Sequence, residues 1–100
     1  MRMIALYKMP PDPAAFDRAY FGTHLPLLAK VPGLERTVVS RFTRTVMGEG
    51  LYLMAEMFFP DLATLKTALK TTQMGEAGQN LATFADGLTT LMWAEEVEPS

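Results

Sequence analysis

The 100-residue sequence contains no cysteine and one histidine, His24. The missing cysteines exclude disulfides, thiolate nucleophiles and cysteine-based metal sites. A metal site built from two or three histidines of one chain is excluded as well. Haem held by His24 alone is the metal-dependent alternative that stays open.

The sequence also lacks a basic stripe and a long apolar segment. Its net charge is −2 and its nine lysines and arginines are scattered, which argues against a nucleic-acid partner. The apolar run at residues 3–7 is too short for a signal-peptide core or a membrane span. We therefore expect a cytoplasmic protein without a membrane partner. Hydrophobic residues at 49% predict one globular domain over residues 1–100.

Hydrophobic periodicity and turn residues predict the order β-α-β-β-α-β. The expected helices cover 13–30, 61–70 and, as a shorter segment, 73–85, and the expected extended stretches cover 2–8, 34–46, 51–59 and 88–97. This order is typical of the ferredoxin-like α+β sandwich, an antiparallel sheet with both main helices on one face.

Segment 51–59 is apolar on both faces, although helices can cover only one. Alternation places Tyr52, Met54, Glu56 and Phe58 on one face and the odd-numbered residues on the other. An uncovered apolar sheet face is typical of an interaction surface. We expect it to pair with a second copy, which gives a homodimeric α/β barrel with Tyr52 and Glu56 in its interior.

The helix over 13–30 contains an irregularity beside His24. Pro26 lacks an amide hydrogen and crowds the carbonyl of Gly22, so a kink or break is expected there. His24 shares an aromatic and apolar helix face with Tyr20 and Phe21. Because imidazole titrates near neutral pH, His24 is the candidate catalytic acid or base. The alternative is a structural histidine bonded to a nearby backbone carbonyl.

Other polar and aromatic side chains have two interpretations each. Glu56, inside the most apolar strand, is either a base or, as we favour, the partner of an arginine such as Arg41 or Arg44. Tyrosines in strands either donate hydrogen bonds to a substrate carbonyl or are ordinary strand residues. The predicted substrate-binding residues are Tyr7, Tyr20, Tyr52, Glu56 and Phe58.

Several segments together resemble the EthD family of the dimeric α+β-barrel superfamily. They are 6–8, 20–27 with its His24-Leu25-Pro26 centre, 31–34, 56–59 and 80–86. The resemblance implies a ferredoxin-like fold, a homodimer and a pocket between helices and sheet. The wider superfamily includes muconolactone-type isomerases, cofactor-free monooxygenases of polyketides and haem enzymes. One position departs from the pattern, because Asn80 stands where such sequences often have an acidic residue.

Three functions follow as hypotheses. The first is a small cofactor-free and metal-free enzyme. In it, His24 assists the isomerisation, dehydration or oxygenation of a small apolar or aromatic molecule. The second is a non-enzymatic dimeric module that binds a hydrophobic metabolite or serves as an accessory subunit. Haem binding through His24 is the third alternative.

Overall fold

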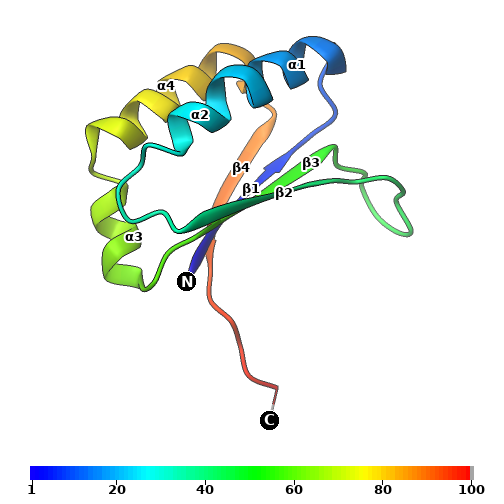
Figure 1. The fold of residues 1–100 in the computed structure, drawn as a ribbon. Helices are drawn as coiled ribbons and strands as arrows, with labels where there is room; N and C mark the ends of the chain where they lie inside the picture. The colour runs from blue at the N-terminus through cyan, green and yellow to red at the C-terminus, as the bar shows by residue number, and fades with distance from the viewer. Residues whose placement is uncertain (100) are drawn as a thin grey trace.

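The computed structural model describes residues 1–99, and its longest helical segments lie on one face of a single four-stranded sheet (Figure 1). The strands are β1 (Arg2–Tyr7), β2 (Arg36–Arg41), β3 (Leu53–Phe58) and β4 (Thr89–Ala94). Their order is β2-β3-β1-β4, with every neighbouring pair antiparallel. This arrangement confirms the predicted ferredoxin-like fold.

Helical structure occupies five elements: α1 (Pro13–Ala19), a π-helical turn η1 (Tyr20–His24), α2 (Leu25–Leu28), α3 (Leu62–Ala68) and α4 (Thr72–Ala85). Side chains cap three of the helix starts. Asp12 accepts from the amide of Ala15, and Asp61 accepts from that of Thr64. Thr71 caps α4 by accepting from the amide of Met74. None of the helices in residues 1–99 is both long and apolar enough to cross a membrane.

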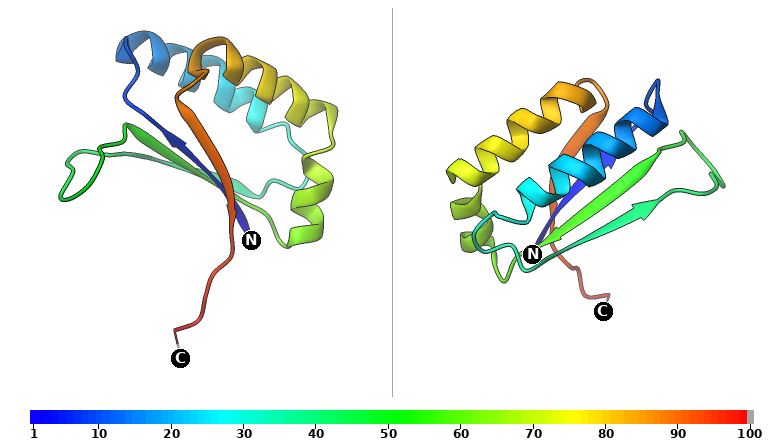
Figure 2. Two further views of the ribbon diagram at one scale, coloured as in Figure 1. Left: turned by 180° about the vertical axis from the view of Figure 1, so that it is seen from behind. Right: turned by 45° about the horizontal axis from the view of Figure 1, so that its top comes forward.

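The second main helix is α4 and not α3, which corrects the prediction. Helix α4 has 14 residues against seven for α3 and lies beside the α1–α2 segment over the sheet (Figure 2). Two glycines within α4, Gly75 and Gly78, weaken its helical signal in the sequence. The inward side of α4 is formed by Ala77, which is buried, and by Met74, Leu81 and Phe84, which pack against the core.

The core lies between the helices and the sheet. Burial alternates along β1 and β3, so that every second side chain faces the helices. An aromatic cluster fills the centre: the ring of Phe16 lies 5.3–5.6 Å from those of Tyr7, Tyr20, Tyr52 and Phe84. This cluster fixes the α1–η1 segment against the sheet.

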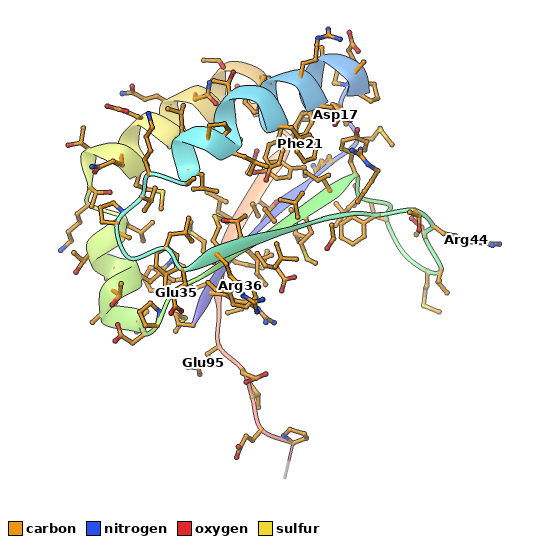
Figure 3. The ribbon with its side chains drawn as sticks, viewed as in Figure 1. Asp17, Phe21, Glu35, Arg36, Arg44 and Glu95 are labelled. Carbon is orange, nitrogen blue, oxygen red and sulfur yellow. The ribbon has the colours of Figure 1, made fainter. Side chains whose placement is uncertain are left out.

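No helix in the described residues covers the opposite face of the sheet, as predicted. Its partly exposed side chains include Ile4, Leu6, Met54 and Met92, and Arg36 lies on the same side (Figure 3). The face is therefore apolar at its centre, with arginines near the Phe58 end.

Candidate functional site

The irregularity in the first helical segment is a π-helical turn. The amide of Leu25 donates to the carbonyl of Tyr20, five residues back, and the next residue, Pro26, has no amide hydrogen to donate. The predicted disturbance between Gly22 and Pro26 is thereby confirmed. The turn directs both Tyr20 and His24 inward, with their rings stacked 5.4 Å apart.

His24 and Tyr20 line an apolar cavity of about 50 Å³ between the helices and the sheet. Its other walls come from β1, α2, β3, α4 and β4: Met3, Ala5, Tyr7, Leu28, Ala55, Met57, Met74, Ala77, Gly78, Leu81 and Leu91. An open groove of about 360 Å³ shares Gly78, Leu81 and Leu91 with the cavity. The groove runs between α4 and β4, so the cavity adjoins the surface there.

Two tyrosine hydroxyl groups face each other beside His24. Burial raises the pKa of Tyr7 far above its ordinary value, and the Tyr20 hydroxyl adds to this effect. Burial also raises the pKa of Tyr20 to about 12, although the neighbouring Tyr7 hydroxyl lowers that pKa by a smaller amount. Both hydroxyls are therefore protonated at neutral pH and available as donors. The Tyr20 hydroxyl is buried without a hydrogen-bond partner.

The imidazole of His24 is neutral at neutral pH. Only 4% of the residue is exposed, and burial lowers its pKa below 6.5. The Asn80 side chain and the Ala77 backbone lie near enough to oppose this effect in part. Nδ1 of His24 and Oδ1 of Asn80 are both buried, and neither has a partner at hydrogen-bonding distance and angle in this structure. A neutral imidazole is a proton acceptor, so the site can act as a base.

Folding stability should depend on the protonation of His24. Because folding lowers the pKa of His24 below 6.5, the unfolded chain binds a proton more readily than the folded chain. We expect stability to fall as the pH drops from 6.5 towards the folded-state pKa, with no such contribution at higher pH. Urea unfolding of wild type and His24→Gln between about pH 7.5 and pH 5 isolates this contribution. A stability difference that stays constant over that range would contradict it.

Three of the six predicted site residues meet at this cavity: Tyr7, Tyr20 and His24. Tyr52 does not, and its predicted position on the open face is wrong. It packs against Phe16 on the helix side, where its hydroxyl donates to Asp17 (2.7 Å) and accepts from Arg41 (2.6 Å). Tyr52 precedes the first residue of β3, so the side-chain alternation of the strand does not extend to it.

Glu56 and Phe58 lie on the open face, away from the cavity. Glu56 forms an ion pair with Arg2 of β1, at 3.5 Å, instead of with Arg41 or Arg44. The ion pair agrees with the interpretation that the sequence favours, but the partner of Glu56 comes from the other neighbouring strand. The Arg36 guanidinium lies 4.3 Å from the ring centre of Phe58. Both residues therefore belong to the surface opposite the cavity.

The site does not fit haem. A cavity of about 50 Å³ has no room for a porphyrin, and the ring of His24 is enclosed by Tyr20 at 5.4 Å and Phe84 at 6.1 Å. Within residues 1–99, no three histidine or acidic side chains are grouped to hold a metal ion. The side chains that can exchange a proton or donate a hydrogen bond at the cavity wall are His24 and the two tyrosines.

Asn80 is not among the site residues that the sequence predicts, where it stands out only as a departure from the family pattern. The structure puts its side chain beside His24. The available signal was its position on α4, between the inward-facing residues Ala77 and Phe84. A polar residue between two such positions is close to the core face of a helix.

Comparisons with known proteins agree with this fold. The EthD domain model matches residues 8–88. An EthD family protein of Bacillus halodurans is 43% identical, and its crystal structure matches with a TM-score of 0.90 over 96% of this chain and 97% of that one. An uncharacterised 11.0 kDa protein from the thcB–thcC intergenic region of Rhodococcus erythropolis is 29% identical, over 95% of this chain and 93% of its own.

A more distant structure shares the fold. SnoaB of Streptomyces nogalater, described as a cofactor-independent oxygenase, is 17% identical, with a TM-score of 0.62 over 99% of this chain and 96% of its own.

Proposed function

The chain belongs to the EthD family, and on that premise we propose that it is a small cofactor-independent enzyme that removes a proton from carbon. The substrate class is a small apolar molecule with a carbonyl or phenol group next to an acidic C–H bond. The observation that carries the proposal is a buried, neutral imidazole beside an unpartnered tyrosine hydroxyl in an apolar cavity.

Each side chain has a defined role in this reaction. His24 accepts the proton from carbon, because its lowered pKa keeps it unprotonated before substrate binds. Negative charge then develops on the substrate oxygen. The Tyr20 hydroxyl donates to that oxygen, and Tyr7 stands next to Tyr20 as a second donor. Donation inside an apolar cavity strengthens as the charge develops, because little water competes there.

The carbanion formed in this way has three outcomes. Return of the proton to another carbon gives isomerisation, and loss of hydroxide from the adjacent carbon gives dehydration. Electron transfer to molecular oxygen begins an oxygenation that needs no cofactor. SnoaB supports the third outcome by analogy, since a cofactor-independent oxygenase has the same fold.

The size of the site restricts the substrate. A cavity of about 50 Å³ holds only a few heavy atoms, whereas the adjoining groove offers about 360 Å³. We therefore assign the reacting carbonyl to the cavity and the remaining apolar or aromatic part to the groove beside Leu81 and Leu91. Small polar acids should bind poorly, because no lysine or arginine of residues 1–99 lines the cavity to pair with a carboxylate.

The direct test is deuterium exchange at the acidic C–H bond of candidate substrates in heavy water, followed by proton NMR. Lactones, cyclic ketones and phenols with apolar substituents form the panel. We expect exchange with wild type and a loss of about 10-fold or more in Tyr20→Phe, which lacks the donor hydroxyl. Tyr52→Phe removes a hydroxyl outside the cavity and is the matched control. Binding without exchange for every compound would replace this function with that of a binding module.

We also propose that the protein is a homodimer through the open sheet face. The apolar centre of that face, which includes Leu6, Met54 and Met92, supports pairing with a second copy. Light scattering at micromolar concentration should give twice the 11.1 kDa of one chain. Leu6→Glu should give a folded monomer, because a buried unpaired charge opposes association. Leu69→Glu, which changes an exposed leucine just after α3, is the control and should stay dimeric. A wild-type protein that is monomeric by light scattering would refute the proposal.

A further inference from the structure

Two buried polar atoms without partners belong to side chains that lie close together, one on η1 and the other on α4. They are Nδ1 of His24 and Oδ1 of Asn80. Buried polar groups in proteins are almost always hydrogen-bonded, so a pair of unsatisfied atoms requires an explanation. The two are complementary: an amide oxygen only accepts, and Nδ1 of a neutral imidazole donates when it carries the ring proton.

The position of Asn80 on α4 fixes its relation to His24. Ala77, three residues earlier, lines the same cavity wall as His24, and the ring of Phe84, four residues later, lies 6.1 Å from the imidazole. Asn80 lies between them on the helix. Among residues 1–99, the other titratable groups that line the cavity are Tyr7 and Tyr20, since its remaining wall residues from all packed elements are apolar or glycine.

We propose that Asn80 is a positioning residue that accepts a hydrogen bond from Nδ1–H of His24 and so selects the tautomer of the ring. With the proton on Nδ1, the lone pair is on Nε2, which becomes the atom that takes the substrate proton. The catalytic meaning of this assignment rests on the proposed function, although the hydrogen bond itself does not. A neutral amide at this position holds the ring without stabilising its protonated form as strongly as a carboxylate would.

The test uses the fact that His24 is the only histidine, so the nitrogen NMR spectrum of ¹⁵N-histidine-labelled protein reports one ring. Above pH 7 we expect protonated Nδ1 and unprotonated Nε2 in wild type. Asn80→Leu should move the equilibrium towards the Nε2–H form. Gln79→Leu removes an exposed amide one residue away on α4 and should leave the spectrum unchanged. An Nε2–H form in wild type, or equal spectra for wild type and Asn80→Leu, would overturn the proposal.

A second variant covers the case in which Asn80→Leu does not fold. Asn80→Asp is nearly isosteric, and its carboxylate should keep the Nδ1–H form while raising the pKa of His24 by about 1–3. The pH profile of deuterium exchange should then move its acidic limb to higher pH by the same amount. An unchanged His24 pKa in Asn80→Asp would contradict the assigned contact. Absence of exchange in every variant, with the tautomer behaviour as expected, would remove the proposed function and leave the hydrogen bond standing.

Discussion

Replacing His24 with glutamine is expected to slow deuterium exchange of a substrate by about 10²–10⁴-fold, the usual contribution of a positioned acid or base. Glutamine fills much of the same space and can hydrogen-bond Asn80, but it has no basic nitrogen at neutral pH. The loss should therefore fall on the chemical step. Exchange rates under saturating substrate measure it, and substrate affinity should change far less than the rate.

The His24→Gln variant has to be folded for this comparison, because His24 is buried among aromatic rings. Circular dichroism and urea unfolding at pH 8 provide that control, since His24 is neutral there in both the folded and the unfolded chain. A folded His24→Gln protein that exchanges within about threefold of wild type would exclude His24 as the base. Tyr20 and Tyr7 would then have to be reconsidered as binding groups alone.

The sequence locates the reactive part of this site for a physical reason. A proline without an amide hydrogen, four residues after a glycine, has to disturb the hydrogen-bond ladder wherever the helix continues. The missing donor places the irregularity at Gly22–Pro26 but does not decide between a kink and a π-helical turn. The helix sequence alone does not contain that choice, because Tyr20 also packs against Tyr7 of β1, which is distant in the sequence.

The errors of the sequence interpretation come from long-range packing. Side-chain alternation correctly places Ala55 and Glu56 on opposite faces of the sheet, because both residues lie within β3. It fails at Tyr52, where the chain bends just before β3. Likewise, helix propensity favours the segment that forms α3 over the glycine-containing α4. Tertiary contacts of α4 with η1 and α2 override that preference.

Removal of the Phe16 ring should give one of the large losses of stability in the protein. Phe16 is 3% exposed and lies within 5.6 Å of the rings of Tyr7, Tyr20, Tyr52 and Phe84. Phe16→Ala should lower the free energy of unfolding by about 3–5 kcal/mol, through lost burial and the cavity left behind. Domains of this size have a free energy of unfolding of only about 5–15 kcal/mol, so this substitution should remove a large part of it.

Phe21 offers the matched control, because it is a phenylalanine of the same helical segment that is 42% exposed. Phe21→Ala should cost about 1 kcal/mol or less, as expected for a side chain at the surface. Urea unfolding of both variants at pH 8 gives the comparison, with the slope of the transition as a check on two-state behaviour. Similar losses in the two variants would show that the aromatic cluster does not hold α1 and η1 against the sheet. The placement of Tyr20 and His24 over the cavity would then need another cause.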